Sequence, residues 1–461
     1  MLPEPLLHAL GHLLGPRLST SAGERALHAQ SESHVSAGAP DAVAYPHSTD
    51  EVAQIAALCA AYGVPITPWG AGTALEGHAL AVHGGLTVDF RDMNQVLAVF
   101  PEDMLCVVQP GVTREDLNTW LRDTGLFFPV DPGANASLGG MASTRASGTT
   151  AVRYGTMRHN VLGLEVVLAG GEVIRTGTSA PKSSAGYDLT ALFVGAEGTL
   201  GLITELTLRL HGQPEAVSAA TCAFPDMAAA VDCVIATIQT GLPMARIEFL
   251  DPATVAACNA FSGTALPLAP QLMVEFHGTA QSVAEQAERF GAIAADYGSR
   301  GFLWARAPED RSRLWKMRHD AYRAILASRP GATAIVTDVC VPISALAQAV
   351  EETRADIAAH GIPGPILGHV GDGNFHAILM VNPVDPREVA TAKHLATRMA
   401  ERSLRLGGTI TGEHGVGFGK LPLMAAEHGA AWAVMGHIKR ALDPMDLMNP
   451  GKLVPQAKDA P

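Results

Sequence analysis

A short segment near residue 370 holds two histidines whose spacing could serve chemistry. It runs Gly-His-Val-Gly-Asp-Gly-Asn-Phe-His from Gly368 to His376. Asp372-Gly373 between apolar runs predicts a two-residue hairpin turn, because a type I′ turn needs positive φ at both central residues. That turn would place His369 directly opposite His376, with Cβ atoms about 4.5–5.5 Å apart. Two imidazoles so placed could share a metal ion; the alternative is an ordinary pair of sheet histidines.

A second segment, Gly412 to Gly417, favours the metal interpretation. It places Glu413 beside a third histidine, His414, in a loop whose glycines allow close approach and unusual backbone angles. His369, His376 and Glu413 form a three-ligand set that leaves a coordination position open for substrate. Zinc suits such a set and manganese is compatible with it. His414 then remains for acid–base work.

Composition limits the class of protein. A chain of 461 residues is too long for one ordinary core, so two or more domains are expected. A hydrophobic content of 48% and a charged content of 17% fit a well-buried globular protein. The net charge of −13, without a cluster of Lys and Arg, argues against nucleic-acid binding.

Cysteine usage and hydropathy bear on location. The six cysteines form no Cys-x-x-Cys pair, which argues against an iron–sulfur cluster and suits a reducing compartment. No apolar run is long enough to span a membrane. We therefore expect a cytoplasmic protein, in solution or peripherally at a membrane, and a homodimer is a compatible assembly.

Four regions follow from the pattern along the chain. Residues 1–40 predict a helical lead-in, and residues 41–214 alternate strand and helix. Within them, Ser48 is expected to cap a helix that ends at Gly63, and residues 131–155 form a long loop of small residues, typical of a binding wall. Residues 215–425 predict an α+β substrate domain carrying the histidine hairpin, and residues 426–461 a helix and a turn-rich tail.

The segment Gly70-x-Gly72-Thr73 follows a strand, so its bare amides and a hydroxyl could line an anionic group. An ordinary turn would explain these residues equally well. The chain has neither a Gly-x-Gly-x-x-Gly fingerprint leading into a helix nor a Walker motif, which disfavours a nicotinamide-type site or a nucleotide hydrolase.

Several motifs in order resemble a known family. Pro68-x-Gly70-x-Gly72-Thr73-x-x-x-Gly77, the 131–155 loop and Gly195-x-Glu197-Gly198-x-x-Gly201-x-Ile203 resemble the FAD-binding domain of the vanillyl-alcohol-oxidase superfamily. The second half, with both histidine motifs and the tail Asp443 to Lys452, is similar to the group of D-lactate dehydrogenases (cytochrome), D-2-hydroxyglutarate dehydrogenases and glycolate oxidase subunits. The segments 128–134 and 151–158 are most similar to the D-lactate dehydrogenase branch.

The resemblance implies an α+β fold, with a two-subdomain FAD-binding domain and a substrate (cap) domain built on an antiparallel sheet. It implies FAD held non-covalently, although some superfamily members attach flavin through a histidine, for which His78 is the candidate. The implied cofactor-binding residues are Pro68, Gly70, Ala71, Gly72, Thr73 and Gly77 at the pyrophosphate loop; Pro132, Gly133, Ser137, Gly140, Ser143, Thr144, Ser147 and Gly148 along the ribityl and ring portions; Glu197, Gly198, Gly201 and Ile203 at the adenosine end; and Asn449 from the tail.

The implied reaction oxidises a D-2-hydroxy acid, first of all D-lactate to pyruvate, with hydride transfer to flavin. The electrons would pass to cytochrome c, a quinone or an electron-transfer flavoprotein. A metal on the hydroxyl oxygen would lower its pKa, and the family likeness assigns the base to His414. It also assigns the substrate carboxylate to Arg318 through a bidentate fork; the alternative for Arg318 is a solvated helix residue.

One departure bears on the substrate. Relatives that act on 2-hydroxyglutarate carry a lysine in a Lys-x-Asp pattern, where this chain has Val336. The missing cation disfavours a dicarboxylate, so D-2-hydroxyglutarate dehydrogenase stays an alternative beside a glycolate oxidase FAD subunit. A metal-dependent hydrolase would leave the 131–155 loop unexplained, and a non-catalytic flavin protein would leave the second histidine motif unexplained.

Overall fold

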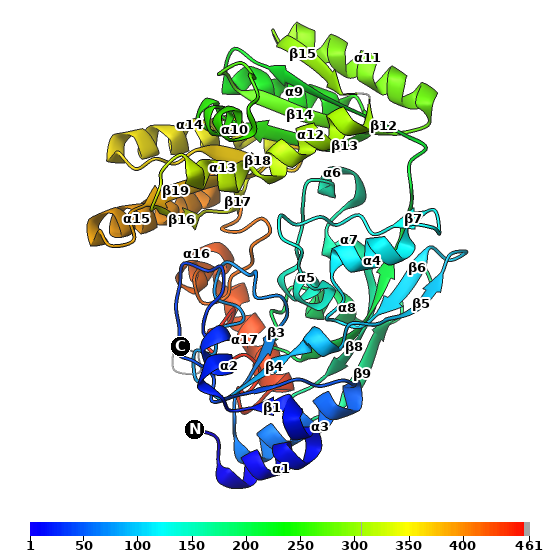
Figure 1. Ribbon diagram of the computed structural model, residues 1–461, viewed down its shortest axis with the longest axis vertical. Helices are drawn as coiled ribbons and strands as arrows, with labels where there is room; N and C mark the ends of the chain where they lie inside the picture. Colours follow the sequence, from blue (N-terminus) through cyan, green and yellow to red (C-terminus); the bar gives the residue numbers. More distant parts are fainter. Residues whose placement is uncertain (306, 456–461) are drawn as a thin grey trace. The chain divides into compact units, whose positions relative to one another are not determined.

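The computed structural model describes residues 1–305 and 307–455, and the chain divides into two compact units (Figure 1). The first unit comprises residues 1–147, 155–213 and the chain from 413 onward. The second comprises residues 148–154 and 214–412. The two histidines of the hairpin therefore belong to the second unit, and Glu413 and His414 open the last segment of the first.

A four-stranded sheet with a parallel core begins the first unit. Its order is β1 (Leu18–Ser19), β2 (Ala42–Ala44), β4 (Leu86–Asp89), β3 (Ile66–Trp69), with only β1 antiparallel. Helices α1 (Glu4–Leu14) and α3 (Thr49–Tyr62) share its apolar core. The predicted limits of α3 are confirmed: Glu51 N donates to Ser48 Oγ at 3.3 Å, and Gly63 ends the helix with φ +63°.

The second sheet of the first unit is antiparallel. Its order is β5 (Val96–Phe100), β6 (Leu105–Val108), β10 (Leu202–Arg209), β8 (Val161–Val167), β9 (Val173–Gly177). A small ribbon pairs β7 (Leu126–Phe127) with β11 (His211–Gly212). The other helices are α2 (Ala22–Leu27), α4 (Arg114–Leu121), α5 (Leu138–Thr144), α7 (Met157–Asn160), α8 (Leu189–Phe193), α16 (Met424–His428) and α17 (Ala430–Leu442).

The 131–155 segment has more structure of its own than the sequence suggested. It contains helix α5 and, in the second unit, α6 (Ala151–Tyr154). The reason is burial: Leu138, Met141 and Ala142 recur at helical spacing and enter the core of the first unit. That burial outweighs the low helix propensity of the glycines between them.

One antiparallel sheet organises the second unit. Its order is β15 (Arg300–Ala305), β12 (Ala216–Ala223), β14 (Gln271–Gly278), β13 (Met244–Leu250), β18 (Ile366–His369), β19 (Asn374–Val381), β16 (Thr333–Val336), and β17 (Val339–Cys340) also pairs with β19. The remaining helices are α9 (Met227–Gln239), α10 (Pro252–Ser262), α11 (Ala280–Asp296), α12 (Pro308–His319), α13 (Ala321–Ala327), α14 (Ile343–His360) and α15 (Pro386–Arg405). Among the described helices, none combines the length and apolar character that a membrane crossing requires.

The two faces of this sheet differ. On one face Phe276 of β14 packs on Phe290 of α11, with ring centroids 5.8 Å apart. Since side chains alternate along a strand, Glu275 and His277 point to the other face. That face packs through an apolar cluster on α10, α12 and α13, and it also carries buried polar side chains on β13, β14 and β19 and the partly buried His369 of β18.

The predicted register of the histidine hairpin is wrong. His369 pairs with Asn374, and His376 pairs with Leu367. Only Gly373 of the central pair has a positive φ, +85°, so residues 370–373 form a wider turn than type I′. The two imidazoles are diagonal neighbours on one face, and their ring centroids still lie 5.6 Å apart.

Candidate active site

The two hairpin histidines are held in matching tautomers. His369 Nδ1 donates to Glu248 Oε1 at 2.7 Å, and His376 Nδ1 donates to the carbonyl oxygen of Thr337 at 3.0 Å. A carboxylate and a carbonyl can only accept, so the neutral rings carry their lone pairs on Nε2. Their ligand nitrogens lie within 4.8 Å of one another. This donor set fits a divalent metal, because ligand histidines ordinarily donate their second N–H to such acceptors.

Arg318 lies beside these histidines in the second unit. It is 8% exposed on α12, so the interpretation as a solvated helix residue is wrong. Its Nη2 forms an ion pair of 2.6 Å with Glu248 Oε2. Glu248 was missed in the sequence; a signal for it was the alternation of Arg246 and Glu248 with apolar residues in an otherwise buried strand.

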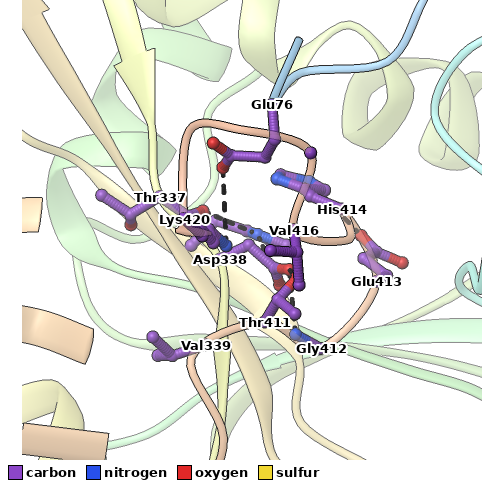
Figure 2. A network of polar contacts seen from close by, with 12 residues as sticks. Glu76, Thr337, Asp338, Val339, Thr411, Gly412, Glu413, His414, Val416 and Lys420 are labelled. Carbon is purple, nitrogen blue, oxygen red and sulfur yellow. Dashed lines mark hydrogen bonds and ion pairs between the residues drawn. The ribbon is translucent and has the colours of Figure 1, made fainter. Parts of the chain in front are cut away.

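A second missed carboxylate, Asp338, organises the end of the second unit (Figure 2). Its Oδ2 accepts from Thr411 Oγ1 at 2.6 Å and from Gly412 N at 2.9 Å, and its Oδ1 accepts from Asn374 Nδ2 at 2.7 Å. Asp338 Oδ1 also lies 3.7 Å from His376 Nδ1. The residue bonded directly to Gly412 is Glu413, the third predicted ligand.

In the first unit, the loop that follows His414 is anchored on Glu197. The two carboxylate oxygens of Glu197 accept from Val416 N at 2.7 Å and from Gly417 N at 2.8 Å. Burial raises the pKa of Glu197, but the His78 ring, 3.2 Å away, and these two amides bring that pKa below its ordinary value. Gly415 has φ +79°, and a Cβ there would lie 2.6 Å from His78 Nε2, so this loop requires glycine.

Further along the loop, Phe418 N and Gly419 N donate to the carbonyl oxygen of Glu76. Lys420 Nζ lies 3.5 Å from Glu76 Oε1 (Figure 2). Residues 416–420 are therefore held by the carboxylate of Glu197 and by the carbonyl oxygen and carboxylate of Glu76.

The predicted FAD-binding segments converge within the first unit. A Cβ on Gly70 would lie 2.2 Å from Ser137 Oγ, a Cβ on Gly198 would lie 2.4 Å from Pro68 Cγ, and Glu197 N donates to the carbonyl oxygen of Ser143 at 2.9 Å. Three loops distant in sequence are thus adjacent. Only Gly148 of the predicted set falls in the second unit, directly after Ser147.

The first of these loops fits an anionic group. Among the described residues, the backbone N–H groups of Ala71, Gly72 and Thr73 donate to no protein acceptor. Gly72 has φ +72° and Gly77 φ +78°, backbone angles that side chains disfavour. Successive amides left available in a turn suit a pyrophosphate.

The C-terminal tail closes against these loops. Asn449 Nδ2 donates to the carbonyl oxygens of Glu197 at 2.7 Å and His78 at 3.0 Å. Lys452 Nζ donates to the carbonyl oxygens of His78 at 2.7 Å and Leu80 at 2.6 Å, and burial lowers the pKa of Lys452 to about 7. Asn449 thus fixes two loops of the predicted cofactor site through its side chain.

Both halves of the sequence match described families. Residues 40–177 match "FAD binding domain", and residues 213–453 match "FAD linked oxidases, C-terminal domain". These matches confirm the predicted resemblance and support FAD as the cofactor.

Curated relatives cover most of the chain. A probable mitochondrial D-lactate dehydrogenase of Danio rerio is 51% identical, over 95% of this chain and 89% of that protein. A mitochondrial D-lactate dehydrogenase [cytochrome] of Arabidopsis thaliana is 44% identical, over 98% and 80%. A glycolate oxidase subunit of Bacillus subtilis is 36% identical, over 91% and 90%.

The predicted cytoplasmic location is contradicted by these relatives. The proteins of Danio rerio, Arabidopsis thaliana and Saccharomyces cerevisiae are all named mitochondrial, which points to a mitochondrial rather than a cytoplasmic location. Free cysteines indicate a reducing environment and do not identify the compartment.

Solved structures agree on the fold. p-Cresol methylhydroxylase has a TM-score of 0.79 at 18% identity, covering 97% of this chain and 96% of that one. Alkyldihydroxyacetonephosphate synthase has a TM-score of 0.77 at 21% identity, covering 98% and 85%. At these identities the likeness concerns the fold alone, and it confirms the predicted architecture of the vanillyl-alcohol-oxidase type.

Proposed function

We propose that this chain, which belongs to the family of FAD-linked oxidases that includes D-lactate dehydrogenases, oxidises D-lactate to pyruvate with the help of a divalent metal. The observation that carries the proposal is that His369, which is partly buried, lies with the buried His376 and Arg318 at one face of the second unit's sheet. A 2-hydroxy acid presents a hydroxyl and a carboxylate side by side. The two histidines could hold a metal ion that meets the hydroxyl, and Arg318 could bind the carboxylate.

The residues of the second unit would bind and orient the substrate. His369 and His376 would supply two nitrogen ligands, and Glu413, which directly follows Gly412 in the chain, would supply the third. A metal held there would polarise the substrate's hydroxyl oxygen. Arg318 keeps donors beyond the one that meets Glu248, and a guanidinium can hold a carboxylate through two of them.

His414 would take the hydroxyl proton on its imidazole as the hydride leaves the same carbon. FAD supplies the hydride acceptor when bound. The tight anchoring of residues 416 and 417 supports this role, because a general base must be held within hydrogen-bond reach of the proton it removes. A cytochrome is the proposed electron acceptor, since three relatives are named D-lactate dehydrogenase [cytochrome].

The test of this function is a single-turnover measurement. D-lactate mixed with the oxidised holoenzyme should bleach the flavin absorbance rapidly, and pyruvate should form in equal amount. A flavin that stays oxidised with D-lactate but is reduced by glycolate would replace the proposal with the glycolate oxidase alternative, which the Bacillus subtilis relative represents.

We expect the FAD to be bound without a covalent link. His78, the candidate for attachment, is buried, and its Nε2 lies 3.2 Å from Glu197 Oε1, so this nitrogen faces a carboxylate of the first unit. Acid precipitation of the purified protein should release the yellow colour into the supernatant. Colour that stays with the precipitate would contradict the non-covalent prediction, and a colourless native protein would contradict FAD.

We expect activity to depend on a divalent metal, zinc or manganese. Dialysis against a chelator should lower turnover of D-lactate in step with the metal removed, while the flavin spectrum stays, because the ligand set and the FAD-binding loops use different residues. Adding Zn²⁺ or Mn²⁺ should restore turnover. Full activity in a sample shown by elemental analysis to lack metal would rule the prediction out.

A further inference from the structure

Glu248 is a fully buried carboxylate at the centre of strand β13. It is 0% exposed, between the buried apolar residues Ile247 and Phe249. Its Oε1 accepts from His369 Nδ1 at 2.7 Å, and its Oε2 forms an ion pair with Arg318 Nη2 at 2.6 Å. A carboxylate removed from water destabilises the fold unless partners compensate its charge. Here the compensating partners are His369, the proposed metal ligand, and Arg318, the proposed partner of the substrate carboxylate.

We propose that Glu248 is a positioning residue that couples the metal site to the substrate-carboxylate site. The inference rests on the proposed function and names a role that the binding residues alone do not provide. One side chain fixes the tautomer of His369 with one oxygen and the orientation of the Arg318 guanidinium with the other. The distance between the ligand nitrogen of His369 and the guanidinium of Arg318, which would bind the substrate carboxylate, is therefore set by one side chain.

Each half of this role has a physical basis. A carboxylate that accepts from Nδ1–H keeps the lone pair of His369 on Nε2 and makes the ring a stronger ligand. The same carboxylate holds Arg318 by one nitrogen, so the guanidinium plane is fixed before substrate arrives. A preorganised clamp loses less entropy on binding than a mobile one.

The neighbouring strand offers a matched control. Glu275 on β14 points to the same face, is 5% exposed, accepts from His277 Nε2 at 2.9 Å and lies 3.6 Å from Arg246 Nε. Burial raises the pKa of Glu275, but His277 and Arg246 bring that pKa below its ordinary value. Glu275 is thus a second buried carboxylate between a histidine and an arginine, with partners outside the predicted ligand set.

The experiment compares Glu248→Gln with Glu275→Gln in the full-length, FAD-loaded enzyme after metal removal by a chelator. Mn²⁺ is titrated into each protein in competition with an indicator dye, and thermal melting is recorded alongside. We expect Glu248→Gln to weaken Mn²⁺ binding about 10–100-fold, the usual effect of losing a partner of a ligand histidine. Glu275→Gln should lower the melting temperature and leave Mn²⁺ affinity unchanged.

A third variant separates the two halves of the role. Arg318→Lys keeps a positive charge beside Glu248, so Mn²⁺ affinity should stay at the wild-type value while KM for D-lactate rises. Glu248→Gln should both raise KM and weaken the metal. If Glu248→Gln does not fold, Glu248→Asp, which keeps the charge but draws it back from His369, is held to the same Mn²⁺ criterion.

The outcomes are distinguishable. A wild-type enzyme that binds no Mn²⁺ or Zn²⁺ would refute the metal site of the proposed function itself. A wild type that binds metal and a Glu248→Gln protein that binds it equally well would refute only the positioning role. Equal weakening in Glu275→Gln would also refute it, because the effect would then belong to any buried charge on this sheet.

Discussion

Replacing His414 by alanine is expected to slow flavin reduction by D-lactate about 10²–10⁴-fold, the range for loss of a general base. The imidazole follows Glu413 in a loop that Glu197 and Glu76 fix at several backbone amides. The two residues adjacent to His414 are a proposed metal ligand and a glycine, so neither replaces the imidazole as a base. Stopped-flow absorbance of the flavin measures the rate directly.

Two further substitutions control this result. His437→Ala removes an exposed imidazole of α17 in the same unit and should leave the rate unchanged. His376→Ala should slow reduction and also release metal, because a ligand is lost, whereas His414→Ala should retain metal. An undiminished rate in His414→Ala would refute the base assignment. Loss of metal in that variant would instead make His414 a ligand.

The candidate metal ligands could be proposed from the sequence because their types are rare and their spacing is local. His369 and His376 lie on one hairpin, and period-two alternation kept them on one face even though the predicted register was wrong. The register depends on the turn, and Asp372 does not adopt the positive φ that a type I′ turn demands. A diagonal pair replaces the predicted opposed pair.

The residues that support the site could not be found in this way. Glu248 lies 121 positions from His369 in the sequence, and only the pairing of β13 with β18 brings them together. Asp338 is likewise brought to its partners, Gly412 and Thr411, by the fold and not by closeness in the sequence. A buried carboxylate in an apolar strand signals that a partner must exist, but the partner's identity comes from strand order, which local patterns do not contain.

The proposed FAD-binding residues fall between these cases. Their resemblance to a family identified them, and physical reasoning from single loops did not. Gly70-x-Gly72-Thr73 alone has the composition of an ordinary turn. Its fit to an anion emerges only when the amides of Ala71, Gly72 and Thr73 are seen to have no protein acceptor among the described residues.

The second large effect that we expect is a preference for D-lactate over D-2-hydroxyglutarate by about 10² in rate of flavin reduction, which corresponds to roughly 3 kcal/mol, the lower end for an unpaired buried charge. Stopped-flow reduction by D-lactate, D-2-hydroxybutyrate, glycolate and D-2-hydroxyglutarate measures it. Fastest reduction by the dicarboxylate would refute the prediction.

The structural basis of this preference is the position of Val336. Val336 pairs with Ile378, two residues beyond His376 on β19, so Val336 and His376 are diagonal neighbours on the same face of the sheet. Val336 packs against the apolar cluster of α10, α12 and α13 and offers no charge. A second substrate carboxylate directed there would lose water without gaining a partner.

Val336→Lys should therefore lower the ratio of the flavin-reduction rates with D-lactate and with D-2-hydroxyglutarate, because the lysine can pair with the second carboxylate. Val336→Met, which adds length without charge, should leave this ratio unchanged. An unchanged ratio in the lysine variant would place the distal end of the substrate elsewhere.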